Sequence, residues 1–263
     1  MKLACQENMA PGGSLEEKVA NLERFGFAGI ELWGSGLPSR VAEINRVVGG
    51  SSLKVSSICA GYRGAWLEAS AEERAVAIAD SKDLLSAGAD VGATGLIMVP
   101  IFGGPRLPDL SPLKTARELE RDLLLKLLDD VGQHAARVRC AVLVEPLNRY
   151  ETHFLNRLEQ ATDIVRELGN PWVRIMADFF HMSVEERDLA DALRRAGDQV
   201  WHVHLADSNR LLPGMGHTDF APGFAALRQA GFDKYMALEC GIPGDPFVEL
   251  PESVAFLNRC LQA

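Results

Sequence analysis

The second half of the chain contains four short apolar runs, and each ends in a carboxylate or an imidazole. The runs are Ala141-Val-Leu-Val-Glu145, Arg174-Ile-Met-Ala-Asp178, Trp201-His-Val-His204 and Tyr235-Met-Ala-Leu-Glu239. Their polar ends follow one another at intervals of about 30 residues, which is roughly the length of one strand–helix unit. If these units form a parallel barrel, the four side chains lie at its carboxyl-terminal rim, where barrel enzymes have their active sites.

Three carboxylates and a neutral imidazole at one place need a cation among them, because the carboxylates repel one another. A single acidic residue at a strand end is more often a helix N-cap or a loop residue, but four polar ends in the same register favour a metal site. We therefore predict one divalent ion held by Glu145, Asp178, His204 and Glu239. Mn²⁺ or Co²⁺ fits this oxygen-rich set better than a thiolate-preferring metal does, with Mg²⁺ or Zn²⁺ as alternatives.

Three more polar residues are expected at the same rim. His181 lies at the start of the loop after its strand, and Glu151 and Arg210 lie in the loops that follow their strands. Sequence position alone favours neither of two roles for each of them, a substrate contact or an ordinary loop residue. His202 faces the same side as His204, one layer deeper, so we predict a hydrogen-bonded interior residue there rather than a ligand.

Other motifs give weaker signals. The stretch Pro213-Gly-Met-Gly-His217 lacks the lysine and hydroxyl residue that end a phosphate-binding loop, so a mobile lid or a turn is expected. The chain has no GxSxG motif, and Cys59 and Cys140 have no evident base partner. Nucleophilic hydrolase chemistry therefore has no support.

The elements that must position these residues alternate along the chain. Eight strands are predicted at Lys2–Gln6, Gly29–Leu32, Val55–Ala60, Gly95–Val99, Ala141–Glu145, Arg174–Asp178, Val200–Leu205 and Tyr235–Glu239. Eight helices are predicted at 14–25, 38–48, 71–91, 113–136, 156–168, 186–196, 221–230 and 248–262. Ser14 and Ser70 resemble helix N-caps, and Pro112 suits a first helical position.

This alternation predicts a parallel sheet covered by helices, and its length suits a closed (β/α)8 barrel formed as one domain over residues 1–263. The alternative is an open doubly wound sheet. Such a sheet usually carries GxGxxG after its first strand. Here residues 8–14 lack that spacing, so the barrel is favoured.

Composition narrows the classes of partner. The chain has 263 residues and a net charge of −9, which disfavours nucleic acid and anionic membranes as partners. Five scattered cysteines without CxxC spacing suit a reduced, cytoplasmic setting. No apolar run approaches the roughly 18 residues that span a bilayer.

Four segments carry a resemblance to a known family. They are Glu145-Pro-Leu-Asn-Arg-Tyr-Glu151-Thr-His-Phe-Leu-Asn, Asp178-Phe-Phe-His181, His202-Val-His204-Leu-Ala-Asp207-Ser-Asn-Arg210 with Pro213-Gly-Met-Gly, and Leu238-Glu239-Cys240. They resemble the xylose isomerase-like TIM-barrel superfamily, and within it the ketose 3-epimerases of the D-tagatose and D-psicose group. The match covers about residues 140–240, and residues 26–33 resemble the second strand of the family.

The resemblance implies a metal-dependent enzyme that acts on a small carbohydrate. It implies that Glu145 and Glu239 are the acid/base pair as well as metal ligands, and that Glu151, His181 and Arg210 contact substrate oxygens. A proton would be removed next to a carbonyl, through a cis-enediolate, and returned on the opposite face. Relatives are often dimers or tetramers, so a homodimer or homotetramer is expected by analogy.

Other chemistries of the superfamily start in the same way. An aldose–ketose isomerase returns the proton to a different carbon, and a lyase or dehydratase of a 3-keto sugar, inosose or dehydroshikimate expels a β-leaving group. A non-catalytic sugar-binding subunit with a structural metal is a further alternative. DNA repair by an endonuclease IV-like protein is disfavoured by the net charge and by the single metal set.

Overall fold

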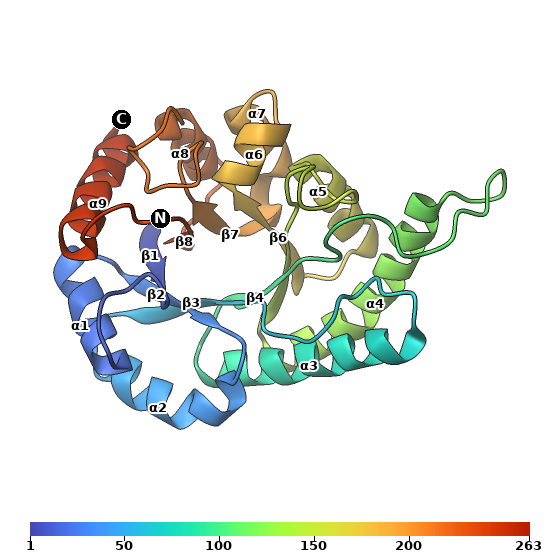
Figure 1. Ribbon diagram of the computed structural model, residues 1–263, viewed down its shortest axis with the longest axis horizontal. Coiled ribbons are helices and arrows are strands. Elements are labelled where there is room, and N and C mark those ends of the chain that lie inside the picture. Colours follow the sequence, from blue (N-terminus) through green and yellow to red (C-terminus); the bar gives the residue numbers. More distant parts are fainter.

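The apolar runs form eight parallel strands that pair in chain order and close with β8 against β1 (Figure 1). The computed structural model describes residues 1–263. The strands are β1 (Lys2–Gln6), β2 (Gly29–Trp33), β3 (Lys54–Cys59), β4 (Gly95–Met98), β5 (Ala141–Val144), β6 (Val173–Asp178), β7 (Val200–Leu205) and β8 (Tyr235–Leu238). All eight predicted strands are confirmed, and so is the closed barrel rather than an open sheet.

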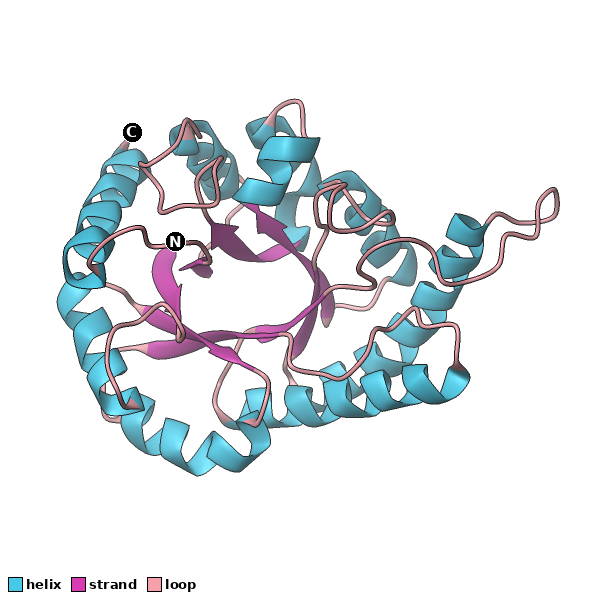
Figure 2. Cartoon of the chain, in the orientation of Figure 1, coloured by secondary structure: helices cyan, strands magenta, loops and turns pink.

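Helices connect the strands and cover the outside of the barrel (Figure 2). They are α1 (Leu15–Phe25), α2 (Leu37–Gly49), α3 (Ala71–Asp90), α4 (Ala116–Val138), α5 (Leu158–Leu168), α6 (Phe179–Glu185), α7 (Leu189–Ala196), α8 (Phe220–Gln229) and α9 (Pro246–Gln262), with a short 3-10 helix at Gly197–Gln199. None of them combines the length and the apolar character that a membrane crossing requires.

Helix starts follow local capping chemistry. Ser14 and Ser70 accept hydrogen bonds from backbone N–H groups in the first turns of α1 and α3, as predicted. The predicted start of the fourth helix near Pro112 is wrong. Helix α4 begins three residues later than predicted, because Thr115 and Glu118 form a reciprocal capping box that satisfies two otherwise free N–H groups.

Helix α6 is the one helix that the sequence pattern did not predict. It begins directly after β6, because Asp178 Oδ1 accepts hydrogen bonds from the backbone N–H groups of Phe180 at 2.7 Å and His181 at 3.1 Å. The expectation that His181 lies in a loop is therefore wrong. The side chain that ends the strand also caps the next helix, which fixes His181 one turn beyond the rim.

The core has an outer and an inner layer. A cluster of 66 buried residues fills the space between the strands and the helices. A cluster of five buried residues lies on the inside of the barrel and contains Cys59, Ile97, Ala141, Leu143 and Met176. Apolar packing thus closes part of the barrel interior.

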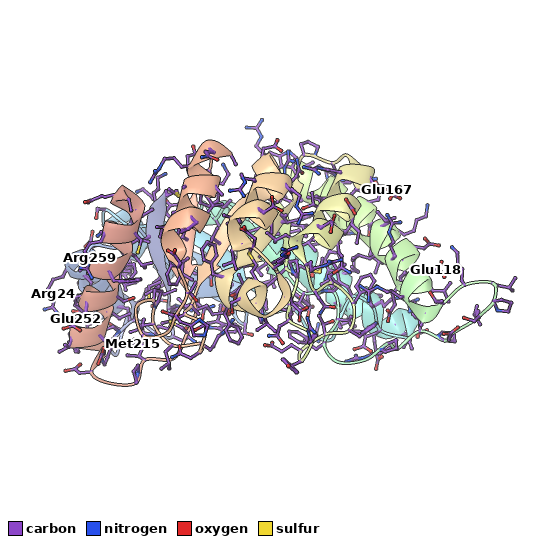
Figure 3. The ribbon with its side chains drawn as sticks, turned by 90° about the horizontal axis from the view of Figure 1, so that it is seen from above. Arg24, Glu118, Glu167, Met215, Glu252 and Arg259 are labelled. Carbon is purple, nitrogen blue, oxygen red and sulfur yellow. The ribbon has the colours of Figure 1, made fainter.

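The barrel has two distinct ends. In the side view of Figure 3, Glu118 at the start of α4 and Met215 in the loop after β7 lie toward one end, while Glu167 at the end of α5 lies toward the other. Helices that follow parallel strands start at the end where the strands finish, so Glu118 and Met215 mark the carboxyl-terminal face.

Two irregularities in strand pairing affect the inward-facing side chains. The β2–β3 register shifts between Ile30 and Glu31, and the β6–β7 register shifts between Ile175 and Met176. After the second shift, Asp178 pairs directly with His204. Such bulges redirect side chains near functional sites. Here the shift places a carboxylate and an imidazole at the same height.

Candidate metal and substrate site

The four predicted metal ligands meet at the carboxyl-terminal face of the barrel. Asp178 ends β6, His204 lies in β7, and Glu145 and Glu239 directly follow β5 and β8. Their ligand atoms all lie within 4.8 Å of one another. His204 Nδ1 is 3.2 Å from Glu239 Oε2, 3.8 Å from Glu145 Oε1 and 3.8 Å from Asp178 Oδ2. The sequence spacing therefore translates into one cluster.

The imidazole of His204 is oriented as a metal ligand would be. Its Nε2 lies 3.0 and 3.1 Å from the two carboxylate oxygens of Glu31, to which it donates. Its Nδ1 is buried and has no hydrogen-bond partner. A buried polar atom without a partner is costly. This atom faces three carboxylates, so a divalent ion at this place would satisfy it and neutralise them, and the donor set fits such an ion.

Arg210 supplies the one guanidinium that contacts this cluster. Its Nη1 donates to Asp178 Oδ2 at 2.9 Å, and its Nη2 donates to Glu239 Oε2. The guanidinium also lies over the ring of Phe180, 4.7 Å from its centroid. Arg210 therefore reaches the cluster from the loop after β7, as its sequence position predicted. It partly compensates the negative charge of two carboxylates.

The two glutamates differ in electrostatic environment. Burial raises the pKa of Glu145 well above its usual value, and the carboxylates of Glu239 and Asp178 raise it further. Burial also raises the pKa of Glu239, but His204 and Arg210 outweigh it and lower that pKa to about 2. Among the protein groups alone, Glu239 is thus the ionised member of the pair and Glu145 the protonated one.

His204 itself holds a proton tightly. Burial lowers its pKa, but the carboxylates of Glu31 and Glu239 outweigh burial and raise the pKa well above the usual value. The imidazole therefore carries a positive charge at neutral pH when no other cation is near. A metal ion that binds Nδ1 has to displace this proton.

His181 lies beside the cluster with its ring orientation fixed. Its Nδ1 accepts hydrogen bonds from the backbone N–H of Asn148 at 3.2 Å and from its side-chain amide at 2.8 Å. Because Nδ1 accepts, Nε2 carries the proton. That nitrogen lies 3.7 Å from Asp178 Oδ2 and 3.5 Å from Arg210 Nη1. His181 can thus donate a hydrogen bond into the site.

Glu151 lies at the edge of the same group, more exposed than the others. Its Oε1 accepts a hydrogen bond from the side-chain amide of Asn148 at 2.9 Å and is 3.8 Å from His181 Nδ1. Asn148 therefore joins two of the predicted substrate contacts, a role that the sequence analysis missed. The available signal was its place in the motif between Glu145 and Glu151.

A second polar layer lies beneath the cluster. His202 Nε2 is 2.8 Å from Glu31 Oε2 and 3.0 Å from Ser57 Oγ, so His202 is a hydrogen-bonded interior residue, as predicted. Glu31 was not singled out from the sequence, although a glutamate inside the apolar strand Gly29–Trp33 was a signal. Glu31, His202 and His204 form a second group with metal-ligating chemistry. Its distances are those of hydrogen bonds, and N–H and O–H donors satisfy the carboxylate.

The glycine-rich stretch after β7 is a turn held by one buried carboxylate. Asp207 Oδ1 accepts from the N–H groups of Ser208 at 2.8 Å and Thr218 at 2.9 Å, and its Oδ2 accepts from Gly214 at 2.9 Å. The N–H groups of the turn thus point at Asp207 rather than toward a phosphate. Of the two predicted roles, the turn is the one observed, and it supports the loop that carries Arg210.

Comparison with known proteins identifies the family of the chain. The family model described as "Xylose isomerase-like TIM barrel" matches residues 19–260. A 3-dehydro-D-guloside 4-epimerase from Escherichia coli K12 is 34% identical over 99% of this chain and 100% of its own. A crystal structure described as an apo 3-keto-D-glucoside 4-epimerase from E. coli has a TM-score of 0.90 at 32% identity, covering 99% and 100% of the two chains.

More distant similarity extends to ketose 3-epimerases. A D-psicose 3-epimerase from Enterocloster bolteae is 39% identical over 120 residues, which are 46% of this chain and 40% of that protein. A D-psicose 3-epimerase structure solved with D-fructose has a TM-score of 0.86 over the whole of both chains at 20% identity, which shows the shared fold.

We expect divalent metal binding to strengthen as the pH rises. The raised pKa values of Glu145 and His204 mean that both groups hold protons which the ion must displace. With one or two protons released, Co²⁺ affinity should increase about 10-fold to 100-fold per pH unit near neutrality. Calorimetric titration in two buffers of different ionisation enthalpy would count the protons. A pH-independent affinity without proton release would contradict this assignment.

Asp207→Ala should lower the free energy of unfolding by about 2–4 kcal/mol at neutral pH, because three partly buried hydrogen bonds lose their charged acceptor. Burial raises the pKa of Asp207, but the surrounding N–H groups outweigh it and lower that pKa. The stabilisation is therefore complete above the usual carboxyl range and is lost as the pH falls below it. Urea unfolding would measure the difference.

The matched control is Asp233→Ala, which removes an exposed carboxylate paired only with its neighbour Lys234. Its effect should stay within about 0.5 kcal/mol. Equal losses for the two variants would show that Asp207 does not hold the turn together.

Proposed function

The chain belongs to the xylose isomerase-like TIM barrel family and is a sugar epimerase, and we propose that it inverts carbon 4 of a glycoside with a ketone at carbon 3. The E. coli relative that carries a 4-epimerase name aligns with nearly the whole chain. Gluco- and gulo-configured glycosides with a ketone at carbon 3 differ only at carbon 4. Inverting that carbon therefore interconverts the two.

The observation that carries the chemistry is the convergence of Glu145 and Glu239 on His204 Nδ1. The two glutamates follow β5 and β8, and two other strands lie between these in the barrel. They therefore reach the site from different directions. Inversion next to a carbonyl needs this arrangement, because one group removes a proton from one face and another returns it to the opposite face.

The proposed ligands of the metal are Glu145, Asp178, His204 and Glu239, and the proposed ion is Mn²⁺ or Co²⁺. The orphaned Nδ1 of His204 and the three surrounding carboxylates support this choice. Bound there, such an ion supplies Lewis-acid stabilisation of the negative charge that develops on the carbonyl oxygen.

The glutamates are proposed to act as a base and an acid. Glu239 has the lowered pKa, so it is ionised and can remove the proton at carbon 4 from one face. Glu145 is proposed to return a proton to the other face, and its raised pKa among the protein groups alone favours proton uptake there. The reverse reaction exchanges the two roles.

The neighbouring polar residues are proposed to orient the sugar. His181 presents an N–H, Arg210 presents its guanidinium and Glu151 presents a carboxylate that is 43% exposed. Sugar hydroxyls both donate and accept hydrogen bonds, so these groups can hold the ring in one orientation. Proximity of the reacting carbon to both glutamates then lowers the barrier by removing the entropy cost of alignment.

Ketose 3-epimerisation is the second candidate. The partial identity with a D-psicose 3-epimerase favours it, since the same α-proton chemistry at carbon 3 of a 2-ketose needs the same groups. The two functions are separated by substrate. We expect a 3-keto glucoside to be turned over faster than D-fructose or D-psicose under equal conditions.

The test is proton NMR of a 3-keto glucoside in D₂O with metal-loaded protein. We expect deuterium at carbon 4 together with the 4-epimer, and a loss of epimerisation of at least about 100-fold in Glu145→Gln and in Glu239→Gln. The matched control is Glu252→Gln on the surface of α9 (Figure 3), which should keep full activity.

Each outcome assigns a different chemistry. Close to full activity in either glutamine variant would remove that glutamate from the reaction. A product that lacks a β-substituent would identify a lyase or dehydratase, and a shifted carbonyl would identify an isomerase. Metal binding without exchange of any sugar proton would indicate a sugar-binding subunit.

A further inference from the structure

Glu31 lies directly beneath the proposed metal ligands and is fully buried. Its two carboxylate oxygens are surrounded by hydrogen-bond donors from four residues on three other strands. The donors are Gln6 Nε2 at 2.9 Å, Ser57 Oγ at 2.6 Å, His202 Nε2 at 2.8 Å and His204 Nε2 at 3.0 and 3.1 Å. Two of these strands, β1 and β3, are adjacent to β2. The third, β7, lies across the barrel, so the carboxylate joins distant parts of the interior.

A buried carboxylate costs several kcal/mol to desolvate unless its oxygens are fully paired. An apolar residue would fill this position without that cost. The complete ring of donors shows that the site is built around an ionised carboxylate, since a protonated one would face donors with its own proton. Barrel packing alone gives no reason for a charge at this depth.

The orientation of His204 follows from this carboxylate. A carboxylate only accepts, so the one proton of a neutral His204 has to be on Nε2, and in that state the lone pair of Nδ1 faces Glu145, Asp178 and Glu239. With a neutral amide in place of Glu31, the amide N–H could donate to Nε2 instead. The proton would then move to Nδ1, the atom that the proposed ion needs.

Gln6 links Glu31 to a second proposed ligand, Glu239. Its side-chain amide donates to Glu31 Oε1 at 2.9 Å and to Glu239 Oε1 at 3.0 Å. Both hydrogens of the amide are used, so the amide is fixed by two carboxylates. One oxygen of Glu239 is therefore held from below, and the other, Oε2, faces His204 and the candidate site.

We infer that Glu31 is a positioning residue of the metal centre, which fixes the tautomer and orientation of His204 directly and restrains Glu239 through Gln6. The inference rests on the proposed metal site. Glu31 is not proposed to touch the ion or the substrate, and it acts through His204, which it contacts, and through Gln6, which contacts Glu239. Partners of this kind typically change metal affinity about 10-fold to 100-fold when they are altered.

The first test is Co²⁺ titration of the folded protein without substrate. Calorimetry would measure the affinity, and visible absorption would report the environment of the bound ion. We expect Glu31→Gln to bind Co²⁺ about 10-fold to 100-fold more weakly than the wild type and with an altered absorption spectrum. Circular dichroism would show that the variant is folded. Unchanged affinity and spectrum in folded Glu31→Gln would overturn the inference.

The matched control is Ser57→Ala. It removes another buried hydrogen bond to the same carboxylate, 2.6 Å long, but leaves the contact between Glu31 and His204 in place. A general loss of stability would appear in both variants, whereas a positioning role predicts weaker Co²⁺ binding in Glu31→Gln alone. Equal weakening in the two variants would reduce Glu31 to a structural role and overturn the inference.

A second measurement needs no variant, in case Glu31→Gln does not fold. In the wild type loaded with diamagnetic Zn²⁺, nitrogen NMR of the histidine rings should show the proton of His204 on Nε2, and a proton on Nδ1 would overturn the inference. A wild type that binds no divalent ion would overturn both this inference and the proposed function. Confirmed metal results without turnover of a 3-keto glucoside would reject only the proposed substrate.

Discussion

Three carboxylates at one end of a barrel are the constraint on which the rest of the site depends. Glu145, Asp178 and Glu239 lie within 4.8 Å of one another and of His204, largely shielded from water. Such a cluster is unstable without positive charge, because repulsion between like charges grows as the local dielectric falls. Within the chain, Arg210 and a protonated His204 supply that charge, and both contact Glu239 Oε2. The groups that neutralise the cluster thus contact carboxylate oxygens that a metal ion would also bind.

The fold meets this constraint by placing each charged group at the end of a strand, and Asp178 also at the start of a helix. Asp178 has two roles, since its Oδ1 caps α6 and its Oδ2 faces the cluster. Helix N-termini carry partial positive charge, so the cap is a favourable contact for this buried side chain. The register shift in β6–β7 then sets Asp178 opposite His204. The contacts that determine the local backbone, namely the cap of α6 and the register shift, therefore also position Asp178 in the site.

The barrel and the upper part of the site could be predicted from the sequence because both depend on features that repeat along the chain. Strand ends in one register share one face, so Asp178 and His204 follow from spacing and alternation alone. Glu31 could not be placed in this way. It meets His202 across a separation of 171 residues, and that contact exists only because the barrel closes with a particular register. Likewise α6 depends on a single capping side chain, and the start of α4 on one capping box, which outweighed the signal at Pro112.

The difference in pKa between the two proposed acid/base glutamates follows from the groups that contact each of them. Glu239 accepts hydrogen bonds from Gln6 and Arg210 and lies beside the imidazole of His204, whereas the carboxylate of Glu145 forms no hydrogen bond with another protein group. Opposite pKa shifts are the electrostatic result of this asymmetry. Reversible inversion of a carbon, however, requires each group to act as the base in one direction. A further positive charge within reach of both carboxylates would favour ionisation of Glu145, whereas Glu239 is already ionised without it. Binding of a divalent cation would therefore make the two groups more alike, which gives the ion a second role beside the stabilisation of developing charge.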